Sequence, residues 1–196
     1  MSKVDKIIKR VFDFSLALIG LLITWPIILT AWIIASFETK SNGFFLQKRV
    51  GQDGKLFTII KIKTMHNNKG STVTTANDNR ITKSGRFFRK YKIDELPQLI
   101  NVLKGDMSFV GPRPDVPGYA DKLKGEDRII LSVKPGITGP ATIKYKNEEE
   151  ILAKVKDPIK YNNKVIWPDK VKINKEYIKN WSLKKDIEYI IKTIKG

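Results

Sequence analysis

The stretch FSLALIGLLITWPIILTAWIIASF, from Phe14 to Phe37, contains no charged residue. As a helix it would be about 36 Å long, enough to cross a bilayer core of about 30 Å. It is longer than the apolar part of a secretory signal, and no small-residue cleavage site follows it. A helix that is apolar on all sides does not suit a small water-soluble domain. This stretch therefore predicts association with a membrane.

Pro26 interrupts the apolar stretch near its middle, directly after Trp25. Proline lacks a backbone N–H, and its ring clashes with the preceding helical turn. Broken at Trp25-Pro26, each half would be about 18 Å long and would enter about one leaflet. Basic residues flank the stretch on both sides, and positive flanks favour the cytoplasmic face. Two hypotheses remain: a re-entrant helix-break-helix and a single proline-kinked span.

The composition restricts the chemistry available to the protein. Its 196 residues include 37 Lys+Arg, 20 Asp+Glu, one His and no Cys. Disulfides, thiolate nucleophiles and cysteine-ligated zinc are therefore excluded, and a Ser/His/Asp triad is disfavoured. Catalysis would depend on carboxylates, Lys or Arg, and a hard cation. The net charge of +17 predicts an anionic partner, which could be nucleic acid, a phosphorylated ligand or an acidic membrane surface.

The pattern divides the chain into a membrane-anchoring segment, residues 1–38, and one further domain, residues 39–196. Two strand-like runs, residues 44–50 and 55–64, flank the turn sequence Gln52-Asp53-Gly54 and predict a β-hairpin. The chain does not show the alternation of strands and helices that a doubly wound sheet requires, so we do not expect that fold. We expect a mostly helical α+β fold.

Residues from 173 onward alternate isoleucines and aromatic residues with lysines. This pattern is typical of an amphipathic helix lying at a bilayer interface. It is equally typical of a helix packed on the core with a solvated lysine face. Both interpretations are kept.

The pair Asp94-Glu95 is the main candidate for chemistry. We expect Asp94 to cap a helix that ends at Gly105, where the positive end of the macrodipole favours the ionised form. An aspartate with an ordinary pKa of about 3.9 could attack without a general base. Two carboxylates can also hold Mg²⁺. Arg89 and Arg113 lie on either side in sequence and could bind a phosphate ester, although such a pair often serves only as a cap.

Longer motifs decide between these interpretations. They are RKYKIDELPQLINVLKGDMSFVGPRP (89–114), KRVFD (9–13), KIKTM (61–65) and KPGITG (134–139). In this order, over nearly the whole chain, they resemble the monotopic phosphoglycosyl transferases, in the family's minimal form. These small bacterial sugar transferases start glycoconjugate assembly on a polyprenol phosphate.

The resemblance implies a re-entrant membrane helix whose break, usually Ser-Pro, is here Trp25-Pro26. It implies an enzyme on the cytoplasmic face of the bacterial inner membrane. Asp94 would attack the β-phosphate of a UDP-sugar, release UMP and carry the phosphosugar until polyprenol (undecaprenyl) phosphate takes it. Mg²⁺ would neutralise the diphosphate. Glu95 would be either a metal ligand or an aid to the acceptor.

The resemblance also assigns substrate-binding residues. Arg89 and Arg113 would hold phosphate or nucleotide, and Lys61 is a further candidate. Lys146 stands where many members of the family have an arginine, and lysine cannot reproduce a bidentate contact.

The alternative function is a membrane-tethered basic module that binds nucleic acid or anionic lipid. Aromatic and basic residues do not interleave as stacking on bases requires, so we expect no nucleic acid partner. The expected partners are a UDP-sugar, polyprenol phosphate and membrane lipid. A homo-oligomer remains an open alternative.

Overall fold

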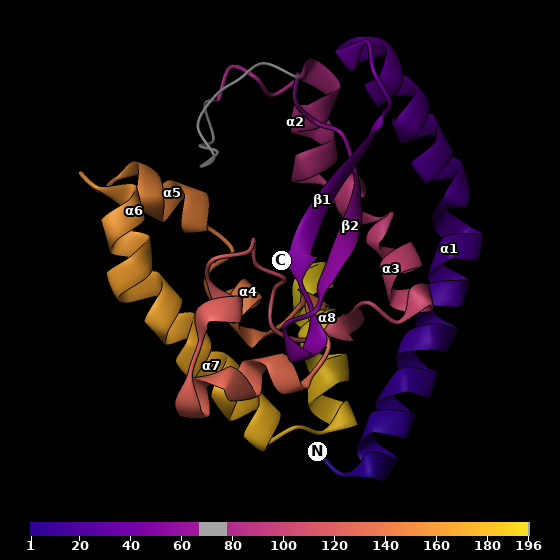
Figure 1. Ribbon diagram of the computed structural model, residues 1–196. Helices are drawn as coiled ribbons and strands as arrows, with labels where there is room; N and C mark the ends of the chain where they lie inside the picture. The colour runs from indigo at the N-terminus through magenta and orange to yellow at the C-terminus, as the bar shows by residue number, and fades with distance from the viewer. Residues whose placement is uncertain (67–77, 196) are drawn as a thin grey trace.

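Helix α1 (Lys3–Thr39) runs along one side of the molecule (Figure 1). The computed structural model describes residues 1–66 and 78–195. The β1–β2 hairpin lies between α1 and α3 on one side and the helices α4 to α7 on the other (Figure 1). The predicted α+β fold, mostly helical with a small hairpin, is confirmed.

The remaining elements follow in chain order. They are β1 (Phe44–Val50), η1 (Gln52–Gly54), β2 (Leu56–Ile62), α2 (Lys83–Lys90), η2 (Ile93–Glu95), α3 (Gln98–Lys104), β3 (Ser108–Val110), η3 (Ala120–Lys122), η4 (Gly125–Ser132), β4 (Gly136–Thr138), α4 (Pro140–Lys144), α5 (Glu148–Ala153), α6 (Pro158–Tyr161), the π-turn η5 (Asn162–Ile166), α7 (Trp167–Lys179) and α8 (Leu183–Lys195).

The strands form two small sheets. Strands β1 and β2 are antiparallel, with Phe44 opposite Ile62, and the tight turn between them places Asp53 at a φ of 57°. Strands β3 and β4 pair in parallel, with Ser108 opposite Gly136. The short β3–β4 pair joins two sequence motifs that are far apart in the chain.

The predicted break at Trp25-Pro26 is wrong: α1 continues through Pro26 as one helix. Proline costs a helix interior about 3 kcal/mol, and packing of both halves on the same domain offsets this cost. Ala17, before the proline, and Ala35, after it, are both fully buried.

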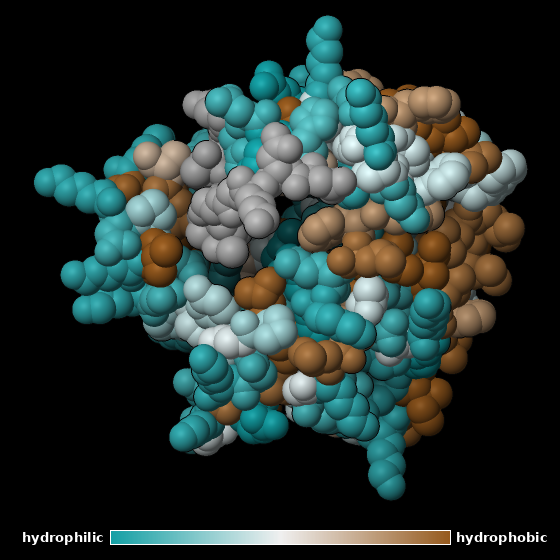
Figure 2. Space-filling view, turned by 45° about the horizontal axis from the view of Figure 1, so that its top comes forward, coloured by the Kyte–Doolittle hydropathy of each residue, from teal (hydrophilic) through white to brown (hydrophobic). Residues whose placement is uncertain are grey.

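The outer face of α1 is exposed and apolar. Its large exposed side chains include Val11, Phe14, Leu18, Leu22, Ile23, Trp25, Leu29, Ile33 and Phe37. Brown atoms gather on the side where α1 lies in Figure 2. By length and composition α1 could cross a membrane. An exposed apolar surface of this extent marks a contact with lipid or another apolar partner.

Polar contacts tie the N-terminal half of α1 to the domain. The ammonium group of Lys9 lies 2.5 Å from the carboxylate of Asp186 on α8, and both side chains are buried. Asp186 also accepts hydrogen bonds from the Tyr177 hydroxyl and the Trp181 indole N–H. Arg10 donates to the carbonyls of residues 102 and 103, near the end of α3.

The other end of α1 is tied to α2. The Glu38 carboxylate accepts a hydrogen bond of 2.9 Å from the backbone N–H of Lys83, and it contacts Ser84. These groups are at the start of α2, whose first N–H groups have no partner within the helix. The domain therefore holds both ends of the apolar stretch.

The C-terminal helices differ in their packing. Helix α7 buries Val171, Tyr177 and Ile178, which confirms the interpretation of this part as a core-packed helix. Helix α8 leaves Ile187 and Ile194 exposed. For α8, an interfacial role remains a prediction.

We predict that Lys9→Met destabilises the protein by about 3–5 kcal/mol, because it leaves the buried Asp186 carboxylate without its cation. The measurement is the free energy of unfolding by denaturant in detergent micelles. Lys6→Met is the matched control, because Lys6 is exposed on the same helix. Equal stability of the two variants would show that the pair does not fasten α1.

Candidate active site

The carboxylate pair lies in a short 3₁₀ turn, not at the start of the following helix. Asp94 and Glu95 belong to η2, and α3 begins only at Gln98. The predicted cap of α3 by Asp94 is therefore wrong. Pro97 has no N–H to complete an α-helical turn, and the turn closes instead through the N–H of Leu96 on the Ile93 carbonyl. The predicted end of the helix at Gly105 is confirmed, with a φ of 87°.

Glu95 connects three segments of the chain. Its carboxylate lies 2.7 Å from the ammonium group of Lys61 on β2 and 3.1 Å from the guanidinium of Arg113. Burial alone would raise the pKa of Glu95, but the two cations outweigh it and hold this pKa well below its ordinary value. Burial lowers the pKa of Lys61, and Glu95 opposes that change. Glu95 is thus a fixed anion that orients both cations.

Asp94 has a different environment from its neighbour. Burial raises the pKa of Asp94, the charge of Glu95 adds to this, and Lys61, Arg89 and Lys92 oppose it. The expectation that a helix terminus favours its ionised form does not hold, since burial dominates. Its Oδ1 atom is buried and accepts no hydrogen bond from residues 1–66 or 78–195. A buried carboxylate oxygen without a donor is costly unless a ligand completes it.

This orphaned oxygen makes Asp94 suitable for holding a cation. Glu95 is already engaged by Lys61 and Arg113, so Asp94 is the better single ligand of the pair. Within the described parts of the chain, no group of three or more His, Asp or Glu side chains could enclose a metal ion. Mg²⁺ needs only one or two carboxylates when phosphate and water complete its shell. The residues present fit that open kind of site.

Two further predicted residues lie in different settings. Arg89 on α2 donates to the hydroxyl of Thr64 at 3.0 Å and to the sulfur of Met65, and its charge acts on Asp94. Lys146 follows α4 and is exposed. The structure thus brings together Lys61, Arg89 and Arg113 around the pair, and substrate binding by Lys146 stays a prediction.

The loop that carries Arg113 is held by strand β1. The Val50 N–H donates to the carbonyl of Asp115 at 2.9 Å, and the guanidinium of Arg49 donates to the carbonyl of Pro114 at 3.3 Å. Arg49 is a residue that sequence reasoning missed. The only indication in the sequence was its position in the first strand of the predicted hairpin. That position does not distinguish it from a solvated arginine.

Close backbone packing positions the same loop from the other side. A Cβ atom on Gly111 would lie 2.5 Å from the carbonyl oxygen of Lys134, and one on Gly136 would collide with the backbone nitrogen of Gly111. Only glycine permits this approach. The motifs GPRP and KPGITG therefore pack on each other, which explains why both contain glycine next to proline.

Asp115 is a second residue that sequence reasoning missed. Burial raises its pKa to about 7, although Lys170, Arg49 and Arg113 oppose this rise. Lys170 comes from α7, where it forms an ion pair of 2.6 Å with Glu148 of α5. Two C-terminal helices thus contribute charges next to the loop of Arg113. No short sequence motif predicted that these residues would lie there.

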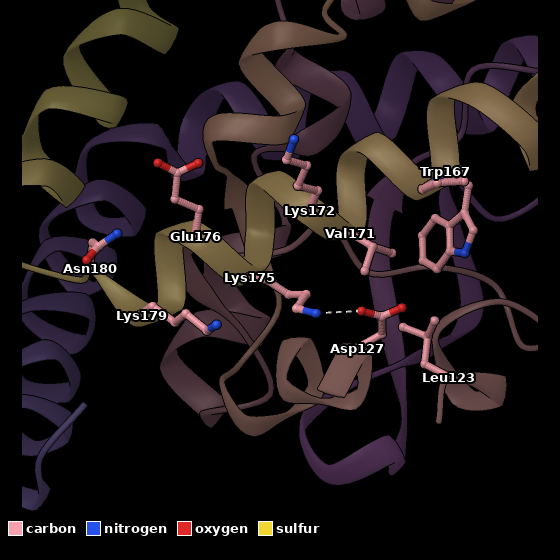
Figure 3. A pocket seen from close by; sticks show the side chains of 10 residues that line it. Leu123, Asp127, Trp167, Val171, Lys172, Lys175, Glu176, Lys179 and Asn180 are labelled. Carbon is pink, nitrogen blue, oxygen red and sulfur yellow. Dashed lines mark hydrogen bonds and ion pairs between the residues drawn. The ribbon is translucent and has the colours of Figure 1, made fainter. Parts of the chain in front are cut away.

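A cavity with none of these residues in its lining lies elsewhere in the molecule. It has a volume of about 580 Å³ and lies between α7 and the segment of residues 123–127, with Trp167 and Val171 among its lining residues (Figure 3). Lys175 and Asp127 form an ion pair of 2.8 Å in this cavity. None of the predicted site residues lines it. A separate hollow with hydrophilic atoms at its floor is visible at the centre of the face shown in Figure 2.

In the described part of the chain, the domain thus combines a helix with an exposed apolar face and the buried Asp94 carboxylate, whose Oδ1 lacks a donor and lies among cations, a site suited to phosphate esters. The profile of a family described as bacterial sugar transferase matches residues 4–196, and the chain belongs to this family of enzymes. The resemblance seen in the sequence is confirmed.

Several bacterial transferases are similar to this chain. The chain is 35% identical over 201 residues to the UDP-glucose:undecaprenyl-phosphate glucose-1-phosphate transferase of Escherichia coli, covering 99% of this chain and 41% of that protein. It is 33% identical to the undecaprenyl-phosphate galactose phosphotransferase of Salmonella typhimurium, covering 97% of this chain and 40% of that protein. An uncharacterized sugar transferase of Bacillus subtilis is 37% identical, with 96% of this chain and 86% of that protein covered. The chain thus spans about two fifths of the first two relatives and most of the third.

We predict that Asp115→Asn stabilises the protein at pH 8 and does so much less at pH 4. The folded-state pKa of about 7 lies above the ordinary 3.8, so the folded protein binds more protons between these values. The contribution of Asp115 to the free energy of unfolding is therefore fully present below pH 3.8 and is lost as the pH rises through 7. Between the two pKa values, the loss is about 1.4 kcal/mol for each pH unit. Unfolding by denaturant at both pH values measures the gap between variant and wild type. A gap that does not change with pH would contradict the prediction.

Proposed function

We propose that this protein transfers a sugar 1-phosphate from a UDP-sugar to a polyprenol phosphate, with Asp94 as the nucleophile. The observation that carries the proposal is the Asp94 carboxylate, which is buried, lacks a hydrogen bond on Oδ1 and lies among cations in a member of this family. The names of the relatives, which act on undecaprenyl phosphate, support the same reaction class.

The reaction would proceed in two displacements. In the first, an Asp94 oxygen bonds to the β-phosphorus of the donor, and the bond from this phosphorus to the bridging oxygen breaks, so UMP leaves. In the second, a phosphate oxygen of the polyprenol phosphate bonds to the same phosphorus, and the bond to Asp94 breaks. The product is a polyprenol diphosphate sugar, and the carboxylate is regenerated.

The cations around Asp94 would position the diphosphate. Arg113 is about half exposed on its side chain and can turn from Glu95 toward a phosphate, while Lys61 stays beneath it. Arg89 contributes charge from α2. Such positioning and charge neutralisation account for most of the catalysis of phosphoryl transfer. Glu95 would keep both cations oriented, which is a different role from the two that the resemblance left open.

Mg²⁺ is part of the proposal, with Asp94 as its protein ligand. When bound, the ion neutralises negative charge on the diphosphate and favours the ionised carboxylate. The free Oδ1 atom supports this assignment.

We also propose that the protein is monotopic, with residues on both sides of the apolar stretch at the cytoplasmic face. Lys9, before the stretch, and Glu38, after it, both contact the one domain. A helix with its ends on opposite sides of a bilayer would require that domain to lie on both sides. The support is this geometry, together with the exposed apolar face of α1.

Asp94→Asn should abolish UMP release, because the amide is a poor nucleophile, while the variant still sediments with membranes. The measurement is UMP formation from a panel of UDP-sugars with undecaprenyl phosphate in detergent. Asp53→Asn is the matched control, since Asp53 is exposed in a turn of positive φ that asparagine tolerates. Full activity of Asp94→Asn would remove this residue from the nucleophile role. In the same assay, EDTA should stop UMP release by the wild type, and added Mg²⁺ should restore it.

Single cysteines introduced at Ser2 and at Lys55 should both react with a membrane-impermeant maleimide in inside-out vesicles and not in right-side-out vesicles. The chain has no native cysteine, so the background is clean. Reaction of the two positions from opposite sides would establish a span.

A further inference from the structure

The Asp115 carboxylate lies in a rigid place without a partner. Its backbone carbonyl accepts the hydrogen bond from Val50, and the preceding carbonyl of Pro114 is held by Arg49. Its side chain is only partly exposed, and it forms no hydrogen bond or ion pair with any residue whose position the structure describes. Two residues earlier, Arg113 reaches Glu95. The carboxylate is thus fixed next to the proposed phosphate-binding arginine.

Three cations act on Asp115, and each also contacts another group. Lys170 is 2.6 Å from the carboxylate of Glu148, Arg113 contacts Glu95, and Arg49 donates to the side-chain oxygen of Gln47 at 2.6 Å. These charges act on Asp115 from a distance without donating to it. A partly buried carboxylate without a donor has lost hydration and gained no hydrogen bond in exchange. It is therefore prepared to accept hydrogen bonds from a bound molecule.

The chemistry of a UDP-sugar restricts which of its groups could contact the Asp115 carboxylate. The phosphates of a UDP-sugar would repel a carboxylate, and they have Arg113 and Lys61 available. The ring hydroxyls of the same molecule, on the sugar and on the ribose, are neutral hydrogen-bond donors. Neighbouring hydroxyl groups can satisfy both oxygens of a carboxylate.

We infer that Asp115 is a specificity-determining residue that accepts hydrogen bonds from ring hydroxyls of the nucleotide-sugar donor. The inference rests on the proposed function and extends it to donor selection. The ring can be the transferred sugar or the ribose of UDP, and the experiment below distinguishes the two.

The test compares the wild type with Asp115→Ala in the UMP-release assay. The donors are the preferred UDP-sugar, its epimers at single ring positions, and its 2′-deoxyribose analogue. Loss of a hydrogen bond to a charged group should raise KM for the preferred donor about 10-fold to 100-fold. The KM for undecaprenyl phosphate should not change. The variant should also lose the wild type's discrimination against one analogue.

The identity of that analogue locates the contact. If the wild type rejects an epimer and the variant accepts it equally, Asp115 binds the transferred sugar. If the wild type rejects the 2′-deoxy donor and the variant accepts it equally, Asp115 binds the ribose. Both results support the inference.

Other outcomes overturn it. An active variant with unchanged donor KM and unchanged discrimination would refute the role of Asp115 and leave the proposed function intact. Equal changes in the KM of both substrates would indicate a general structural effect, and would also refute it. No UMP release by the wild type from any donor would refute the proposed function and this inference together.

Controls separate recognition from folding. Asp127→Ala removes a carboxylate that pairs with Lys175 in the separate cavity, and it should leave all donor constants unchanged. Asp115→Ala should unfold at the wild-type temperature or above, because the side chain makes no hydrogen bond or ion pair with the described residues and its burial disfavours the charged form. Asp115→Asn, which keeps one acceptor oxygen, should lie between Asp115→Ala and wild type in donor KM.

Discussion

The attachment of α1 to the domain is the constraint on which the rest of the structure depends. Small residues on its inner face let the domain approach closely: Ala17, Ala31 and Ala35 are almost completely buried. A side chain in place of the hydrogen of Gly20 would lie 3.2 Å from Leu99 of α3. At the two ends, polar groups of the helix are paired inside the protein. The helix can therefore present a long apolar face outward while its charged residues remain satisfied.

This attachment also places the site close to the membrane helix. Helix α3 packs on α1 through Leu99, and η2, which carries Asp94 and Glu95, directly precedes α3. The outer face of α1 is suited to lipid, while the pair of carboxylates lies on an element packed against its inner side. For the proposed reaction, such a position would bring the lipid phosphate and the soluble nucleotide sugar to one surface.

Two adjacent carboxylates have acquired opposite properties from their surroundings. Glu95 has two cations in direct contact and is held ionised, whereas Asp94 is buried with one oxygen unpartnered. Environments that separate the pKa values of neighbouring acids commonly separate their roles. Here the separation distinguishes a residue that orients cations from one that is free to react. Asp115 extends the pattern, since it too is a carboxylate that nearby cations influence without binding.

The sequence by itself determined the long apolar segment, the hairpin and the family, because these depend on local composition and on long motifs. Lys61 and Arg113 contact Glu95, and the charge of Arg89 acts on Asp94, while substrate binding by these residues stays a prediction. The sequence could not predict that α1 would continue through Pro26, since the compensation comes from residues packed against both halves of the helix. It could not predict the burial of Asp94 or the places of Arg49, Asp115 and Lys170. Burial and charge contacts between distant segments arise only when the chain folds, so the tertiary structure alone decided which carboxylate is paired and which is left open.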